Sequence, residues 1–177
     1  IKNMNIQIIT NKRSWLDVSY KTKIINTLKR FSKKIFFTYN FKSLKDKYDI
    51  NIILSYSRKI PKKNLKKSKF NLIVHESNLP NGKGMSPLTW QILANKKFVY
   101  FSLFNASPQI DNGEIYYKKK INFSKDLIFN EIKEIQFKEG LKLIIKFIKF
   151  YKKNQKTPKA YSQIGKSTFF KLRNKND

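Results

Sequence analysis

The chain has 177 residues, 40% of them hydrophobic and 15% aromatic, which is enough to bury one core and excludes a disordered composition. It has no cysteine and one histidine, which excludes disulfides, thiolate metal sites and a cysteine nucleophile, and we expect no metal site. The formal net charge of +28 fits either a polyanionic partner or a codon bias toward lysine; we favour the bias, because only four of the 39 basic residues are arginine.

The first half of the chain alternates short apolar runs with one amphipathic stretch. Residues 5–10, 34–40, 48–57 and 70–75 predict strands, and the third run is apolar enough to predict a fully buried strand. Between the first two runs, apolar residues at helical spacing predict a helix over residues 18–31. Its buried face would carry Val18, Ile24, Ile25, Leu28 and Phe31.

The second half contains two helix signals and two strand signals. Ser86 and Pro87 predict the cap and first turn of a helix. Residues 97–104 and 114–123 predict strands on either side of the turn QIDNG. Residues 124–153 predict helical structure, with Ser124 as its N-cap and Gly140 as a candidate break. We place one domain at residues 4–153 and an irregular tail at 154–177, which carries the aromatic anchors Tyr161, Phe169 and Phe170.

This order of elements predicts an α/β fold with a mostly parallel central sheet and helices on both faces. In such folds ligands bind beyond the carboxyl ends of the strands. His75 ends the fourth predicted strand, and histidine is the residue type whose unperturbed pKa lies near neutral pH. The position therefore favours a functional histidine, although a core histidine at a strand end is the alternative.

Two turns carry the other candidate residues. After His75, the residues Pro80, Gly82 and Gly84 would allow a ligand to approach the backbone closely, and Lys83 adds a positive charge. Asp111 and Gly113 lie in a turn directly before a strand. An ordinary Asp-Asn-Gly turn is the alternative interpretation there.

Taken together, these motifs resemble the folate-dependent formyltransferases, a family that includes glycinamide ribonucleotide, methionyl-tRNA and amino-sugar-nucleotide formyltransferases. The resemblance covers roughly residues 4–150. It is strongest for short bacterial members of the sugar-formyltransferase type, over the segment NLIVHESNLPNGKGMSPLTWQIL. The matching residues are His75, Ser77, Leu79, Pro80, Lys83, Gly84, Pro87, Asp111 and Gly113, and residues 54–65 resemble the segment that lines the family's folate pocket.

The resemblance implies a Rossmann-like domain that transfers a formyl group from 10-formyltetrahydrofolate to a primary amine without a metal. His75 would donate to the developing oxyanion, and Asp111 would accept or relay a proton. The family's third catalytic residue, an Asn two positions before the His, is replaced here by Ile73. Asn71 is the candidate substitute, provided that its strand is bulged or shifted in register.

The resemblance also implies binding roles. The folate would contact Tyr56, Ser57, Ile60, Pro61, Ile110 and Gly113, and the acceptor would contact Ser77, Pro80, Gly82, Lys83 and Gly84.

Several functions remain open from the sequence. We expect a nucleotide-linked amino sugar as the acceptor. The alternatives are a methionyl-tRNA formyltransferase-like activity, a nucleic-acid-binding protein without catalysis, and an inactive family member. No apolar run approaches the ~20 residues of a membrane span, and the first residues do not resemble a signal peptide. We therefore expect a cytoplasmic protein with no membrane contact, whose oligomeric state the sequence leaves open.

Overall fold

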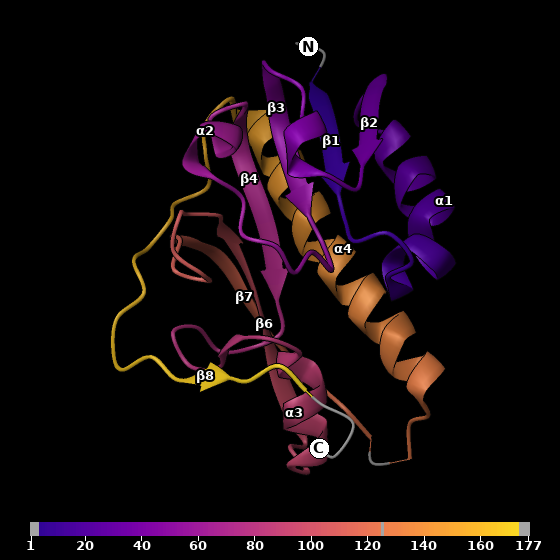
Figure 1. Ribbon diagram of the computed structural model, residues 1–177, viewed down its shortest axis with the longest axis vertical. Helices are drawn as coiled ribbons and strands as arrows, with labels where there is room; N and C mark the ends of the chain where they lie inside the picture. Colours follow the sequence, from indigo (N-terminus) through magenta and orange to yellow (C-terminus); the bar gives the residue numbers. More distant parts are fainter. Residues whose placement is uncertain (1–3, 125, 174–177) are drawn as a thin grey trace.

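A six-stranded sheet forms the centre of the protein, shown in Figure 1 as a computed structural model that describes residues 4–124 and 126–173. Its strand order is β2-β1-β3-β4-β6-β7. The first four strands are parallel, and the last two run antiparallel to their neighbours. The strands are β1 (Asn5–Ile9), β2 (Lys34–Thr38), β3 (Tyr48–Ile53), β4 (Ser68–His75), β6 (Phe98–Asn105) and β7 (Ile115–Asn122). The predicted α/β fold with a mostly parallel sheet is therefore confirmed.

Helices flank this sheet. The long helices α1 (Trp15–Lys29) and α4 (Phe129–Asn154) contact each other, and α4 packs on β4, β6 and β7. A smaller apolar cluster around Ile53 and Ile60 includes the end of α2 (Lys62–Leu65) and the short helix η1 (Phe41–Ser43). The helix α3 (Pro87–Leu93) follows the histidine loop and begins after Ser86, as predicted, although the Ser86 side chain makes no capping hydrogen bond.

The helix α1 begins three residues earlier than its apolar pattern predicts. Ser14 is the N-cap, because its hydroxyl accepts a hydrogen bond from the Asp17 N–H. This start buries Leu16 and Tyr20 along with Ile24 and Leu28, whereas Val18 is 73% exposed. The assignment of Val18 to the buried face was therefore wrong.

The helix α4 is continuous over its 26 residues, so Gly140 does not break it. Gly140 is buried against Val74 of β4. This packing against the sheet stabilises the helix at the glycine. The helix also starts later than predicted. Its N-cap is Ile128, whose N–H donates to the Glu131 carboxylate, and Ser124 precedes the helix.

The segment after α4 has more order than the predicted irregular tail. It runs back along the sheet and crosses the histidine loop, where β8 (Phe169–Phe170) pairs in parallel with β5 (Lys83–Gly84), as the yellow ribbon in Figure 1 shows. Of the three expected anchors, Tyr161 and Phe169 are 44% and 66% exposed, and Phe170 is partly buried.

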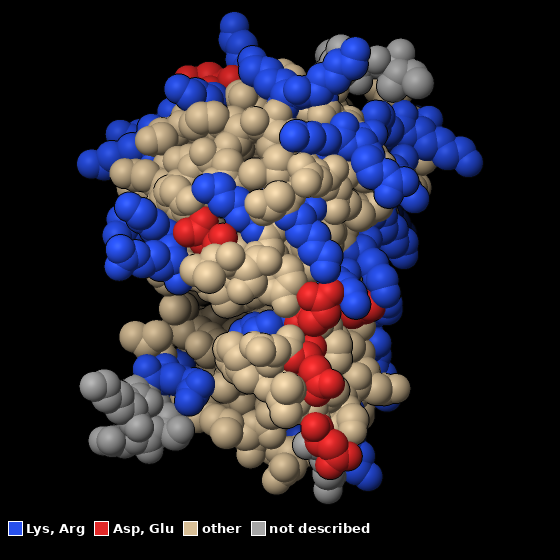
Figure 2. Space-filling view, turned by 90° about the vertical axis from the view of Figure 1, so that its right-hand side faces the viewer, with Lys and Arg blue, Asp and Glu red and all other residues tan. Residues whose placement is uncertain are grey.

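Basic side chains dominate the surface. Figure 2 shows the side that carries α1 and α4, where many Lys and Arg side chains lie over the upper part and along its edges, with other residues between them, and most acidic groups lie lower down. On α4, Glu134 pairs with Lys23 and Lys138, and Glu139 pairs with Lys119 and Lys142. Among the described residues, no helix is both long and apolar enough to cross a membrane.

Candidate active site

A cavity of about 400 Å³ lies where the parallel strands end. Its walls come from the loop after β1 together with α1, the loop after β3, the end of β4 with the segment leading into α3, and the segment from the end of β6 to the Asp111 turn. Polar and apolar residues of α4 close a further side. The site therefore occupies the position that an open, mostly parallel sheet offers to a ligand.

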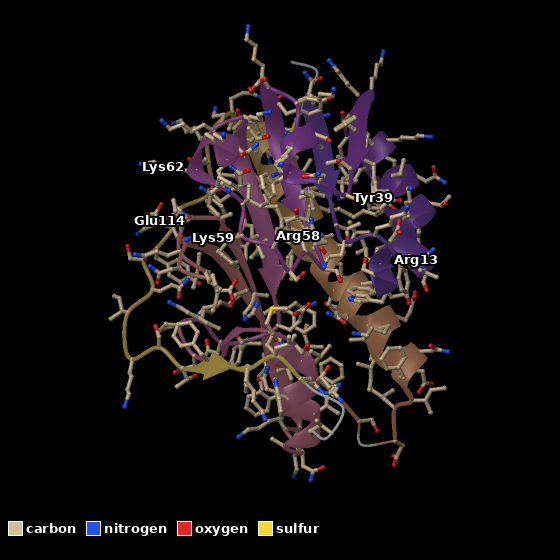
Figure 3. The ribbon with its side chains drawn as sticks, viewed as in Figure 1. Arg13, Tyr39, Arg58, Lys59, Lys62 and Glu114 are labelled. Atoms are coloured by element: carbon tan, nitrogen blue, oxygen red, sulfur yellow. The ribbon has the colours of Figure 1, made fainter. Side chains whose placement is uncertain are left out.

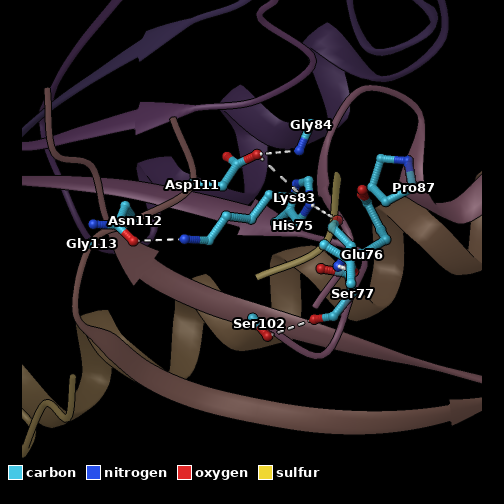
Figure 4. Close-up of polar contacts among 12 residues, drawn as sticks. His75, Glu76, Ser77, Lys83, Gly84, Pro87, Ser102, Asp111, Asn112 and Gly113 are labelled. Carbon is cyan, nitrogen blue, oxygen red and sulfur yellow. Dashed lines mark hydrogen bonds and ion pairs between the residues drawn. The ribbon is translucent and has the colours of Figure 1, made fainter. Parts of the chain in front are cut away.

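His75 and Asp111 meet at this cavity (Figure 4). The His75 Nε2 atom lies 3.8 Å from Asp111 Oδ2, and their side chains are only 7% and 12% exposed. The same carboxylate oxygen accepts a hydrogen bond of 2.8 Å from the Gly84 N–H. This bond fixes the carboxylate beside the imidazole, so the predicted pair is brought together.

A second contact restricts the His75 ring. Its Nε2 atom lies 2.7 Å from the carbonyl oxygen of Gly82. A carbonyl oxygen can only accept, so this contact requires a proton on Nε2. The Nε2–H is therefore directed at the Gly82 carbonyl, and the same nitrogen lies 3.8 Å from Asp111 Oδ2.

Several residues of the cavity wall have unusual backbone conformations. Ser55, Ser86 and Asp111 line the cavity with φ angles of 49°, 53° and 48°. L-residues rarely adopt this left-handed conformation, and such strain concentrates at functional sites. These three positions support a functional role for the cavity.

Four of the six residues predicted to hold folate line the cavity: Tyr56, Ser57, Ile60 and Ile110. The Tyr56 hydroxyl is buried and has no hydrogen-bond partner within the described parts of the chain. Such a group needs a partner to offset its desolvation, which favours a polar ligand atom there. Pro61 caps α2 outside the lining, and Gly113 lies against the Asn105 carbonyl, where a Cβ atom would clash.

Of the residues predicted to contact the acceptor, only Gly84 lines the cavity. Lys83 is buried, and its Nζ atom donates to the Asn112 side chain at 2.6 Å. The Ser77 side chain is also buried, and Pro80 follows a cis peptide bond in the same loop.

The two glycines of the loop face Phe170 of the tail. A Cβ atom would lie 2.7 Å from the Phe170 ring at Gly82 and 2.4 Å from the Phe170 carbonyl oxygen at Gly84. These glycines therefore allow the tail of the same chain, rather than a ligand, to approach the backbone closely.

Asn71 does not join the pair. Strand β4 keeps continuous register with β3, pairing Asn71 with Asn51 and Ile73 with Ile53, so the bulge that Asn71 would need is missing from this described strand. The Asn71 side chain donates to the Leu65 carbonyl and accepts from the Asn51 amide. Ile73 lines the cavity in the position nearer His75.

Comparison with known proteins now identifies the family. A family described as "Formyl transferase" matches residues 2–148. The chain belongs to the formyl transferase family.

Curated relatives of this chain include methionyl-tRNA formyltransferases. The chain is 29% identical to that of Orientia tsutsugamushi over 103 residues, which are 58% of this chain and 34% of that protein. It is 25% identical to that of Prochlorococcus marinus over 136 residues, 73% of this chain and 42% of that protein. The chain thus spans about a third to two fifths of the length of these relatives.

Solved structures share the fold. The methionyl-tRNA formyltransferase from Clostridium thermocellum superposes with a TM-score of 0.72 at 23% identity, covering 97% of this chain and 73% of that one. The formyltransferase PseJ from Anoxybacillus kamchatkensis, solved with UDP-4,6-dideoxy-4-formamido-L-AltNAc and tetrahydrofolate, superposes with a TM-score of 0.65 at 18% identity. That match covers 95% of this chain and 86% of PseJ.

The sequence did not predict the wall of the cavity that faces the pair. Glu76, Gln136 and Lys133 all line the cavity. The Gln136 amide donates to the Glu76 carboxylate at 2.7 Å and accepts from Lys133 Nζ at 2.8 Å. Burial lowers the pKa of the Lys133 ammonium, and the negative charge of Glu76 opposes that shift. The position of Glu76 directly after His75 was the one available signal, because the α4 residues have ordinary surface-helix composition.

Proposed function

We propose that this member of the formyl transferase family moves a formyl group from 10-formyltetrahydrofolate to the primary amine of a nucleotide-linked amino sugar. The observation that carries the proposal is the His75–Asp111 pair beside the cavity at the end of β4. No other described residue is a histidine, so the pair supplies the one imidazole available for acid–base chemistry.

The chemistry needs one donor and one proton acceptor. A bond forms between the amine nitrogen and the formyl carbon, the bond from that carbon to the folate nitrogen breaks, and a proton passes from the amine to the folate nitrogen. His75 would donate its Nε2–H toward the formyl oxygen, sharing it with the Gly82 carbonyl, as negative charge develops on that oxygen. Asp111, held by the Gly84 N–H, would take up the proton directly or through a water.

The folate side of the cavity would be the wall formed by Tyr56, Ile60 and Ile110. Two apolar side chains suit the flat faces of the pterin, and the unpartnered Tyr56 hydroxyl suits one of its polar edges. Tetrahydrofolate is bound in the related structures of HypX from Aquifex aeolicus and of PseJ, which share this fold.

The mouth of the cavity suits an anionic acceptor. Arg58 and Lys59 line it and are exposed, and Figure 3 shows them on the loop after β3, with Lys62 beyond them. None of these three side chains forms an ion pair with a carboxylate of the described residues. A diphosphate-linked sugar would bring negative charge to this mouth while its amine reaches the pair. The UDP-linked sugar in the PseJ structure supports this choice.

Methionyl-tRNA is the second candidate acceptor. The curated relatives favour it, because those compared are methionyl-tRNA formyltransferases at 23–29% identity. Both acceptors present a primary amine to the formyl group. They differ in the group that carries this amine, which is a nucleotide-linked sugar in one and methionyl-tRNA in the other.

Two experiments test the proposal. Calorimetry with the unreactive 5-formyltetrahydrofolate should show saturable binding by the wild-type protein, and Tyr56→Phe should weaken it by about fivefold to tenfold, the scale of one lost hydrogen bond. Tyr100→Phe, on β6 outside the cavity lining, is the matched control and should bind like the wild type.

Tetrahydrofolate release should then be followed with UDP-linked 4-amino sugars and with charged initiator methionyl-tRNA. Tetrahydrofolate release with the sugars alone supports the proposal. Tetrahydrofolate release with the tRNA alone would show that methionyl-tRNA, the second candidate, is the acceptor. Absence of folate binding by the folded protein would refute both.

A further inference from the structure

The segment after α4 contacts both loops that hold the His75–Asp111 pair. The histidine loop and the Asp111 turn are far apart along the chain, and the carboxylate and imidazole meet only if both loops keep their places. The tail touches first the Asp111 turn and then the histidine loop (Figure 1).

The contacts with the histidine loop are backbone hydrogen bonds around its glycines. The Gly82 N–H donates to the Thr168 hydroxyl at 2.8 Å, and the Lys83 N–H donates to the Thr168 carbonyl at 2.9 Å. The Met85 N–H then donates to the Phe170 carbonyl at 3.2 Å. These bonds fix the peptide units on both sides of Gly82, whose carbonyl accepts the His75 Nε2–H.

The contacts with the Asp111 turn come from a single side chain. The Gln163 amide donates to the carbonyl of Asp111 at 2.8 Å and to that of Gly113 at 3.0 Å. Next to it, Tyr161 pairs with Ile115 at the start of β7 through backbone bonds in both directions. Gln163 therefore holds the turn at the residue that carries the carboxylate, where the backbone has a φ of 48° and needs support.

We propose that residues 161–170 act as a strap that positions the His75–Asp111 pair, with Gln163 and Thr168 as its positioning residues. Gln163 fixes the Asp111 turn and Thr168 fixes Gly82, so the strap sets the separation between carboxylate and imidazole. The catalytic consequence rests on the proposed function, whereas the geometric consequence does not.

The kinetic test uses one isosteric change at each contact. Thr168→Val removes the hydroxyl, and Gln163→Glu keeps the side-chain shape while it removes the donor amide. Each should lower kcat by about tenfold or more while KM changes less than twofold, because a small misplacement of reacting groups slows the chemical step. Thr168→Ser restores the hydroxyl and should restore kcat.

Matched controls come from the same segment of the chain. Thr157→Val removes an exposed hydroxyl that forms no hydrogen bond with the described residues, and Ile164→Ala changes a side chain that is 88% exposed next to Gln163. Both should keep wild-type kcat and wild-type melting temperature.

The geometric test does not need activity. Because His75 is the only histidine in the sequence, its imidazole gives a single set of NMR signals that reports on its surroundings. These signals should move in Thr168→Val and in Gln163→Glu, and should return to their wild-type positions in Thr168→Ser.

If the wild type transfers no formyl group but the signals move as expected, the proposed function fails and the strap stands. If the variants only lower the melting temperature while kcat and the imidazole signals stay as in the wild type, the strap is ordinary packing and the inference is overturned.

Discussion

Hydrogen bonds to the backbone fix the positions of His75 and Asp111 more than a contact between their two side chains does. The Asp111 carboxylate is held by the Gly84 N–H at 2.8 Å, whereas it lies 3.8 Å from His75 Nε2. Asparagine at position 111 would still accept that N–H but could not take up a proton. This difference separates the chemical role of the residue from its structural role.

We therefore predict that Asp111→Asn lowers the rate of formyl transfer by roughly 10²-fold or more, the scale of losing an acid–base group, while the protein stays folded. His75→Ala should cause a loss of similar size, because it removes the N–H donor. Steady-state kinetics and circular dichroism measure the two effects. Asp46→Asn, at an exposed site away from the cavity, is the control. Wild-type rates in both site variants would exclude the mechanism.

Asn71 was the candidate substitute for the family's catalytic Asn, and its side chain makes structural contacts instead. Its amide donates to the carbonyl of Leu65, at the end of α2, and its side-chain carbonyl accepts from the Asn51 amide on β3; all three residues are buried. We predict that Asn71→Ala lowers the free energy of unfolding by about 1–3 kcal/mol, because buried polar groups lose their partners. Urea unfolding measures this loss.

The exposed Asn26→Ala is the matched control for that change and should unfold like the wild type. In conditions where Asn71→Ala is fully folded, its kcat should stay within twofold of the wild type. A stable variant with a large loss of kcat would return Asn71 to the catalytic machinery.

At the scale of the elements, hydrophobic patterns predicted the central strands well because those strands are buried and leave little polar alternation. Helix ends were harder to place. The start of α1 depends on the Ser14 hydroxyl and not on an apolar residue, and α4 continues through Gly140 because packing against β4 outweighs the low helix propensity of one glycine. Contacts between distant segments, such as those of the tail with the histidine loop, leave no periodic signal in the sequence.

One ion-pair cluster connects the two long helices and should respond to pH. Glu134 of α4 accepts from Lys23 of α1 at 2.9 Å and lies 3.2 Å from Lys138. The hydrogen bond from Lys23 lowers the pKa of Glu134 from its ordinary 4.5 to about 2, although partial burial acts in the opposite direction. A carboxylate with a lowered folded-state pKa stabilises the fold above pH ~4.5, and this stability is lost as the pH falls toward 2.

We predict that Glu134→Gln lowers the free energy of unfolding at pH 7 by about 0.5–1 kcal/mol, a modest value because the pair is partly exposed. The difference from the wild type should shrink below pH ~4.5 and vanish near pH 2, where the wild-type carboxylate is protonated as well. Urea unfolding across that range provides the measurement. Glu114→Gln, at an exposed carboxylate that forms no ion pair with the residues that the structure describes, should show no such dependence. A difference that is constant with pH would mean that the cluster contributes only packing.

For the whole molecule, the family resemblance predicted the residues of the site. The composition did not decide whether the positive charge reflects a polyanionic partner or codon bias. The motif residues predicted the His75–Asp111 pair, because their spacing belongs to a fold in which both loops lie at the strand ends. The wall of Glu76, Gln136 and Lys133 could not be predicted, since it depends on how α4 crosses the sheet. The charge of +28 is spread over many elements, and Figure 2 shows it covering much of one face rather than following a groove.

This spread predicts weak and non-specific binding to nucleic acid. If six or more phosphates are contacted, affinity for RNA should fall by about 10³-fold or more between 50 and 200 mM salt, because binding rests on counterion release. Fluorescence anisotropy with labelled initiator tRNA, competed by an unrelated RNA of equal length, should show equal competition. Replacing Arg58 and Lys59 at the cavity mouth by alanine should weaken binding no more than replacing Lys149 and Lys153, which are exposed on α4. Salt-resistant preference for initiator tRNA, lost only when the mouth residues are replaced, would show that the charge serves tRNA recognition and would favour methionyl-tRNA as the acceptor.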